Sequence, residues 1–183
     1  MLKATTVKTT SELQQIIQLQ QNNIAANISP TELQEQGFVT VVHTIEVLQQ
    51  MHALQPGVIV KAGDFVVGYA LVMPLTFRGF VPELEPMFEK LQTLHYHNQP
   101  LGNYRFYIMG QICIAKQHRG KSVFDMLYQH HKILFEKDFD FVLTEIATRN
   151  HRSLRAHARI GFKQINTYTD ATDEWSVVMW DWK

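Results

Sequence analysis

One segment in the second half of the chain, residues 107–124, most limits what this sequence can fold into. Residues 107–115 are an apolar run typical of a buried strand, and residues 117–122, Gln-His-Arg-Gly-Lys-Ser, form a short basic loop. A helix is predicted over 121–137, beginning at the end of this loop. Because the first N–H groups of a helix lack partners and the helix dipole is positive at this end, the loop favours an anion. The segment therefore predicts a phosphate site between a strand and a helix.

Hydrophobic periodicity and turn signals predict the other elements. Strands are expected at 4–9, 58–61, 65–73, 141–147 and at two segments between 162 and 182, around the turn 170–173. Helices are expected from Ser11 with its capping-box partner Gln14, from Ser29 and Pro30 to Gly37, over 45–54, within the connection 75–103, and over 150–160 before Gly161. The runs 58–61 and 65–73 predict an antiparallel hairpin, and strand, helix, strand over 107–147 predicts a parallel pair.

Composition narrows the class of protein. With 183 residues, 45% hydrophobic and 19% charged, the chain fits a single globular domain over 1–183. Apolar stripes that should face its core are Leu13, Ile16, Ile17 and Ile24, then Leu84, Phe88, Leu91 and Leu94, then Val123, Leu127 and Leu134. Lysine plus arginine and aspartate plus glutamate are 17 each, so the net charge gives no sign of a nucleic-acid partner.

Cysteine content and the N-terminus bear on the compartment. A single cysteine, Cys113, excludes an internal disulfide and a multi-cysteine zinc site, which fits a reducing environment. The first residues lack the apolar core of a signal peptide, and no apolar run is long enough to cross a bilayer. We therefore expect a cytoplasmic protein without a membrane partner.

Two classes of phosphate loop fit the basic segment. Residues 115–122 come close to the Walker A pattern G-x-x-x-x-G-K-[ST], with alanine in the first glycine position. A nucleotide-hydrolysing loop also needs a magnesium-orienting aspartate at the carboxyl end of a second strand. Asp140 instead precedes the strand at 141–147, which disfavours this interpretation.

The same loop more closely resembles motif A of the GNAT superfamily of acetyl-CoA-dependent N-acetyltransferases, [QR]-x-x-G-x-[GA], read here at 117–122 after the apolar triplet 112–114. Residues 150–162 resemble motif B, N-x-x-S-x-x-x-Y-x-x-x-G-F, at matching spacing, with His157 in place of the tyrosine. Ser122 replaces the final small residue of motif A, and Phe124 follows where many members carry another residue.

The resemblance implies a mixed α/β fold: a central, mostly antiparallel sheet with one splayed parallel strand pair, flanked by helices. It implies an enzyme that transfers acetyl from acetyl-CoA to a primary amine in a ternary complex, without a metal. The alternative within the same fold is a non-catalytic coenzyme A-binding or regulatory module. A homodimer is compatible with the sequence, and the acceptor amine stays open.

The resemblance also assigns site residues. The coenzyme would contact Ile112, Cys113, Ile114, Gln117, His118, Arg119, Gly120, Lys121, Ser122, Val123, Asn150 and Ser153. In this assignment the backbone of the strand binds the pantetheine arm and polarises the thioester carbonyl, while the loop binds the pyrophosphate. Arg119 and Lys121 add positive charge.

Two residues are candidates for catalysis. His157 is the predicted general acid, because the family tyrosine at this position lies near the coenzyme sulfur and imidazole titrates near neutrality. The alternative is a histidine hydrogen-bonded at the sheet edge. Glu145 is predicted to orient the amine or to receive its proton through water. The alternative is a salt bridge to Arg149, Arg152 or Arg155. Cys113 and the adjacent pair His130 and His131 are expected to be packing or solvated residues rather than a nucleophile or metal ligands.

Overall fold

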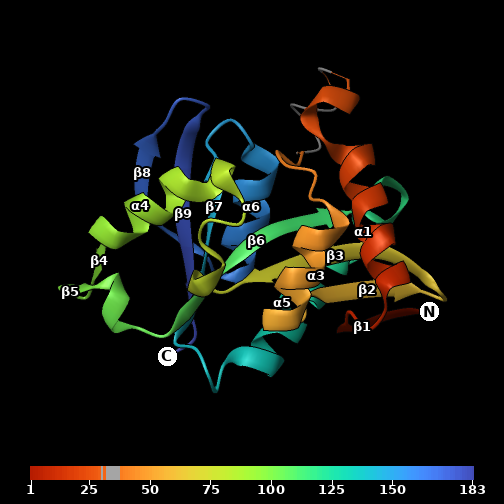
Figure 1. The fold of residues 1–183 in the computed structure, drawn as a ribbon, viewed down its shortest axis with the longest axis horizontal. Coiled ribbons are helices and arrows are strands. Elements are labelled where there is room, and N and C mark those ends of the chain that lie inside the picture. The colour runs from red at the N-terminus through yellow and green to blue at the C-terminus, as the bar shows by residue number, and fades with distance from the viewer. Residues whose placement is uncertain (30, 32–37) are drawn as a thin grey trace.

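The structure, a computed structural model, describes residues 1–29, 31 and 38–183 (Figure 1). The helix predicted between Ser29 and Gly37 therefore lies outside the described residues. In the described part of the chain, no helix combines the length and the apolar character needed to cross a membrane.

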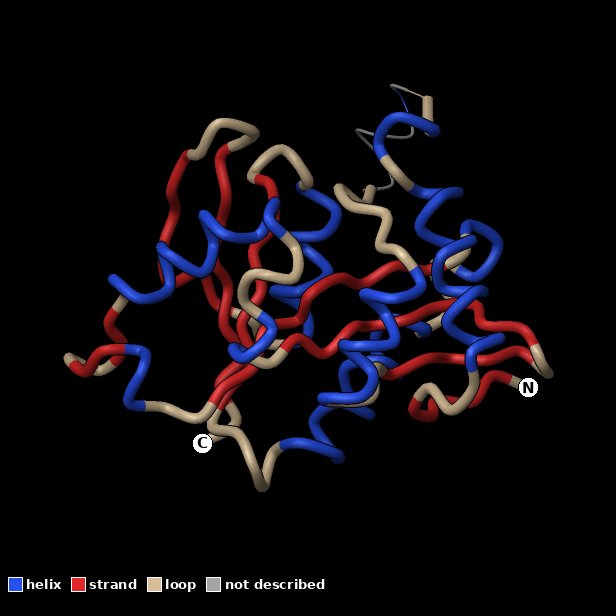
Figure 2. Tube along the Cα trace, in the orientation of Figure 1, coloured by secondary structure: helices blue, strands red, loops and turns tan. Residues whose placement is uncertain are grey.

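A central sheet organises the fold (Figure 2). In the described residues it has seven strands in the order β1-β2-β3-β6-β7-β9-β8, and β6 with β7 is the one parallel pair. The strands are β1 (Leu2–Thr6), β2 (Val58–Ala62), β3 (Phe65–Met73), β6 (Phe106–Ile114), β7 (Phe141–Ala147), β8 (Lys163–Thr169) and β9 (Glu174–Asp181), with a separate small hairpin of β4 (His95–Tyr96) and β5 (Gln99–Pro100). The predicted fold class, the predicted hairpin and the predicted parallel pair are confirmed.

The beginning of the chain departs from the prediction. The first strand ends at Thr6 rather than at residue 9, and the capping box of the next helix is Thr9 with Glu12 rather than Ser11 with Gln14. The Thr9 hydroxyl accepts from the Glu12 N–H at 3.2 Å, and the Glu12 carboxylate accepts from the Thr9 N–H at 3.1 Å. Both residue pairs fit the capping pattern. A tertiary contact distinguishes them, because Glu12 also pairs with Lys61 of β2 at 2.8 Å.

Helices cover both faces of the sheet (Figure 1). They are α1 (Thr10–Asn23), α3 (Ile45–Leu54), α4 (Glu85–Thr93), α5 (Val123–Phe135) and α6 (His151–Ile160). Adjacent residues of β3 show the two faces, because successive side chains of a strand point to opposite sides. Tyr69 lies beside Gln20 of α1, whereas Gly68 faces Val123 of α5.

Helix α5 is shorter than the predicted 121–137, and its buried face differs from the predicted one. Val123 and Leu127 are buried as expected, but Leu134 is exposed and Phe135 is buried instead. The buried positions follow a spacing of four residues, which brings His131 into the core as well. Because histidine is usually counted as polar, the sequence pattern did not mark this position.

We predict that Gly68→Ala destabilises the protein by about 1–3 kcal/mol through overpacking. A Cβ atom on Gly68 would lie 2.7 Å from Cγ1 of Val123, at the start of α5. Urea unfolding measures the effect. Val123→Ala in the same chain removes the clashing methyl groups, so the double variant should lose less stability than the sum of the two single changes. Additive losses would contradict the proposed contact.

Candidate active site

The parallel strands β6 and β7 diverge along their length. Their pairing covers three residue pairs and ends at Ile108 with Leu143, although both strands continue. At the point of separation the Thr144 hydroxyl donates to the Met109 carbonyl at 3.0 Å. The next residue, Gly110, is an extra residue in the pairing of β6 with β3, and such a bulge bends a strand. The predicted splay is therefore present, and it leaves the backbone of β6 beyond Met109 facing an opening.

The basic loop continues β6 into α5. It contains a 3₁₀ turn at Lys116–His118, then Gly120 with φ +73°, then Ser122 with φ +59°. Glycine adopts this left-handed conformation at little energetic cost, whereas serine is strained in it. Ser122 precedes α5 as its N-cap but makes no side-chain capping bond. The turn thus presents backbone N–H groups at a helix N-terminus, which is the arrangement that binds phosphate.

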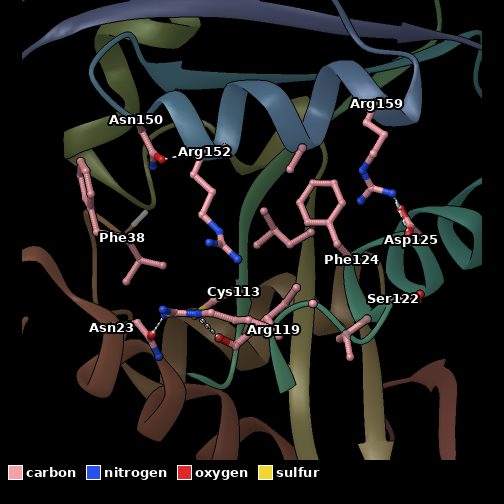
Figure 3. Close-up of a pocket in the computed structure, with 17 residues that line it drawn as sticks. Asn23, Phe38, Cys113, Arg119, Ser122, Phe124, Asp125, Asn150, Arg152 and Arg159 are labelled. Atoms are coloured by element: carbon pink, nitrogen blue, oxygen red, sulfur yellow. Dashed lines mark hydrogen bonds and ion pairs between the residues drawn. The ribbon is translucent and has the colours of Figure 1, made fainter. Parts of the chain in front are cut away.

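A cavity of about 360 Å³ lies between this loop and helix α6 (Figure 3). Nine of the predicted coenzyme residues line it, namely Ile112, Cys113, Ile114, Arg119, Gly120, Ser122, Val123, Asn150 and Ser153. The other three, Gln117, His118 and Lys121, belong to the same loop but are not part of the lining. The structure therefore brings the two motifs together around one hollow.

Arginines give the cavity positive charge. Arg119 lies along one wall, where its guanidinium donates to Oδ1 of Asn23 at 2.6 Å and to the Ile114 carbonyl at 3.4 Å. Arg152 extends from α6 on the opposite wall toward Arg119 (Figure 3). Arg159, also on α6, pairs with Asp125 at 2.8 Å. Two arginines converging on one cavity suit a ligand with several negative charges.

Sequence reasoning missed several of the lining residues. They are Asn23, Phe38, Val39, Phe124, Asp125, Arg152, Ala156 and Arg159. Phe124 was singled out as a departure from motif A, and it both lines the cavity and packs against the rings of Tyr128 and His157. Asn23 and Phe38 reach the site from distant parts of the chain, so no local pattern could mark them. Arg152 lies within motif B, four residues before Ala156 and seven before Arg159, and this spacing, which places all three on one face of α6, was the available signal.

A smaller cavity of about 90 Å³ adjoins the first, between the diverging strands. The two share Phe38, Val39, Ile112, Asn150 and Ser153 in their linings. Glu145 of β7 lies in the smaller one, where its carboxylate accepts from the Tyr168 hydroxyl at 2.5 Å. Burial raises the pKa of Glu145 to about 7, although the bond from Tyr168 acts in the opposite direction. A carboxyl group that titrates near neutrality is suited to accept a proton.

His157 is enclosed by the fold. It is 2% exposed, and its Nε2 lies 2.6 Å from the Tyr128 hydroxyl while its Nδ1 lies 2.8 Å from the Ser153 carbonyl. Since a carbonyl only accepts, Nδ1 carries the proton and Nε2 accepts from Tyr128. Burial lowers the pKa of His157 to about 4. These contacts favour the packing alternative, and the general-acid role stays a prediction.

The remaining candidates are packed inside the fold or partly exposed. Cys113 is buried, and burial raises the pKa of its thiol to about 11, which makes a thiolate nucleophile unfavourable. His131 is buried with Nδ1 at 3.0 Å from the Tyr107 hydroxyl, while its neighbour His130 is partly exposed. Among the described residues no group of three His, Cys, Asp or Glu side chains could hold a metal ion.

No family model matches the sequence, and no curated protein sequence matches it. Solved structures, in contrast, match along the whole chain. An N-acetyltransferase from Staphylococcus aureus Mu50 superposes with TM-score 0.65 and 16% identity, over 100% of this chain and 99% of that one. The ribosomal-protein-S18-alanine N-acetyltransferase from Escherichia coli gives TM-score 0.64 and 9% identity, over 99% and 94%. A chain of the NatC complex bound to Gag peptide and CoA gives TM-score 0.64 and 13% identity, over 100% and 99%.

The fold is that of the GNAT acetyltransferases, as the two sequence motifs predicted. At these identities the likeness establishes the fold alone.

Proposed function

We propose that the protein is an N-acetyltransferase that moves the acetyl group of acetyl-CoA directly to a primary amine. The observation that carries the proposal is that the two cavities adjoin, with five lining residues in common. A phosphate-binding turn and two arginines lie at one end, a carboxyl group with a pKa near 7 lies at the other, and the open edge of β6 lies between them. N-acetyltransferases and a complex bound to CoA among the structural relatives support the same function.

In the proposed complex the pantetheine arm lies along the edge of β6 at Ile114 to Ile112, in the larger cavity, and only its thioester end reaches the smaller cavity. Strand β6 has no backbone pairing with β7 beyond Ile108 in the described residues, so an extended chain with its own amides can take the place of a neighbouring strand. The N–H groups of Ile112 and Ile114 bind the arm and polarise the thioester carbonyl. The pyrophosphate occupies the turn that contains Gly120 and Ser122, with Arg119 and Arg152 supplying positive charge.

The chemical step is a direct acyl transfer. The lone pair of the amine attacks the thioester carbonyl carbon, the new C–N bond forms, and the C–S bond breaks with its electron pair going to sulfur. Glu145 receives the proton that the amine nitrogen loses, directly or through a water molecule. The thiolate takes a proton from solvent and leaves as the free thiol of coenzyme A. No covalent enzyme intermediate is required.

Calorimetric titration with acetyl-CoA and a thiol-release assay with added amines test this function. We expect saturable coenzyme binding and thiol release that depends on the amine. No measurable coenzyme binding at millimolar concentration would contradict the proposal. Tight binding without turnover of a broad panel of amines would favour the non-catalytic coenzyme A module.

We predict that Arg152→Ala weakens acetyl-CoA binding by about 10- to 100-fold, because a hydrogen bond to a charged group contributes about 1.5–3 kcal/mol. Arg152 lines the larger cavity. Arg155→Ala is the matched control: it removes the same charge from an exposed position of α6 outside both linings. Equal weakening in the two variants would show that the overall charge of the helix, rather than the position of Arg152, sets the affinity.

A further inference from the structure

The smaller cavity, which is the acceptor end of the proposed site, has an acidic side chain and no cationic one among its described lining residues. Fourteen described residues line the smaller cavity, and no lysine or arginine is among them. The lining includes two ionisable side chains, Glu145 and His157. His157 is neutral near pH 7 in its buried position, and Glu145 ionises as pH rises through its pKa of about 7, so at pH 8 Glu145 supplies the charge there. The rest of the lining consists of apolar and neutral polar residues, including the rings of Phe38 and Trp175.

Residues around this cavity reinforce the negative charge. The Trp175 indole N–H donates to the Asp170 carboxylate at 2.9 Å, and Asp170 lies close enough to Glu145 to disfavour its ionisation. Arg152 lines the larger cavity and not the smaller one. Arg149 lies beside the smaller cavity and is already paired. Its Nε donates to Asp173 at 2.6 Å, and its guanidinium lies 4.6 Å from the centre of the Phe38 ring.

An acidic group on the acceptor would therefore meet an unfavourable environment. A carboxylate bonded to the carbon next to the amine would enter the same small cavity as Glu145, with no cationic side chain in the lining to pair with it. Desolvating an unpaired anion beside another anion is strongly unfavourable, and such mismatches are how sites exclude related ligands. An ammonium group suffers no such penalty, because it pairs with the Glu145 carboxylate. It then releases one proton to solvent, and the neutral amine attacks the thioester.

We propose that the acceptor is an amine with no carboxylate or phosphate next to the reacting nitrogen, carried on an alkyl or aryl body that contacts Phe38 and Trp175. Free α-amino acids are excluded, whereas their decarboxylated or amidated counterparts fit. This inference rests on the proposed N-acetyltransferase function and specifies its substrate class.

Matched acceptors separate charge from size. We would compare phenylethylamine, phenylalanine amide and phenylalanine, together with the corresponding leucine series, by thiol release from acetyl-CoA at pH 8. The amide and the acid have nearly the same bulk and differ in charge. We expect kcat/KM to be at least about 100-fold higher for the amine and the amide than for the acid. Amino acids turned over within threefold of their amides would overturn the inference and leave the proposed function intact. If no compound of either series gave thiol release, both the inference and the proposed function would be contradicted.

A charge placed at the rim provides an independent test. Thr40 is exposed and lines the smaller cavity, so Thr40→Lys adds a cation where the lining has none. We expect this variant to narrow the preference for phenylalanine amide over phenylalanine by at least tenfold. Gln14→Lys, on an exposed position of α1 outside both linings, should leave the preference unchanged. An equal change in both variants, or none in Thr40→Lys, would count against a charge-based exclusion.

Discussion

Glu145→Gln is expected to lower kcat/KM by about 10²- to 10⁴-fold, the usual contribution of a general base. Glutamine keeps the shape of the side chain and can still accept a hydrogen bond from the Tyr168 hydroxyl, which lies 2.5 Å from the carboxylate. It cannot take the proton of the amine. Acetyl-CoA binding, measured by calorimetry, should stay within threefold of the wild type. Glu89→Gln on the exposed side of α4 is the matched control. Retained activity in Glu145→Gln would remove Glu145 from the mechanism.

The role of Glu145 as the base also predicts how kcat/KM changes with pH. The pKa of Glu145 is raised to about 7, chiefly by burial, so the carboxylate form needed for catalysis appears as pH rises. We therefore expect kcat/KM to increase up to about pH 7 and then to level off. Tyr168→Phe removes a hydrogen bond that stabilises the carboxylate, which should move the midpoint to higher pH. A profile that does not move would show that another group is the base.

The same pKa shift predicts an effect on stability. A carboxyl group whose pKa is higher in the folded protein than in the unfolded chain takes up a proton on folding between these two values. For Glu145 the window runs from about 4.5 to about 7, and the free energy of unfolding should fall as pH rises through it. Glu145→Gln removes this decrease, so the variant should be more stable than the wild type at pH 8. Urea unfolding at pH 5 and pH 8 measures the difference.

His157→Ala is expected to destabilise the protein by about 3–5 kcal/mol, as deletion of a large buried side chain does. The change leaves a cavity beside the rings of Phe124 and Phe162 and removes the hydrogen-bond partner of the buried Tyr128 hydroxyl. Tyr128→Phe breaks the same hydrogen bond with little change in volume, so it should lose only about 1–3 kcal/mol. Chemical denaturation measures both values.

Activity and pH separate the two roles of His157. In the packing role, variant protein that remains folded should keep kcat within about tenfold of the wild type. Since the pKa of His157 is lowered to about 4 in the folded state, the wild type should lose stability as pH falls from 6.5 toward 4. His131 acts in the same direction, so His157→Ala should make this acid loss shallower without abolishing it. A stable variant with a rate lowered more than 100-fold would instead identify His157 as the general acid.

Local signals in the sequence predicted much of this fold correctly. The apolar run before the basic loop predicted β6, and the strand, helix, strand order predicted its parallel pairing with β7. The prediction of the start of α1 was wrong, because two nearby residue pairs fit the helix-capping pattern equally well. Thr9 with Glu12 and Ser11 with Gln14 both fit a capping box, and the contact of Glu12 with Lys61, which is 49 positions away, accompanies the first. The prediction that Leu134 faces the core was also wrong. The buried row of α5 includes a histidine, which a hydrophobic pattern does not mark.

What the sequence by itself determined is the strand and loop of the proposed coenzyme end. The strand, the glycine-containing loop and the start of α5 are neighbours in the chain, and the conformation of a turn depends on its own residues. What only the tertiary structure decided is the smaller cavity, the proposed acceptor end. Phe38, Glu145 and Trp175 come from three distant segments, and their meeting depends on how far β6 and β7 separate. The tertiary structure also decides the pKa of Glu145, because the pKa follows from burial rather than from neighbours in the sequence.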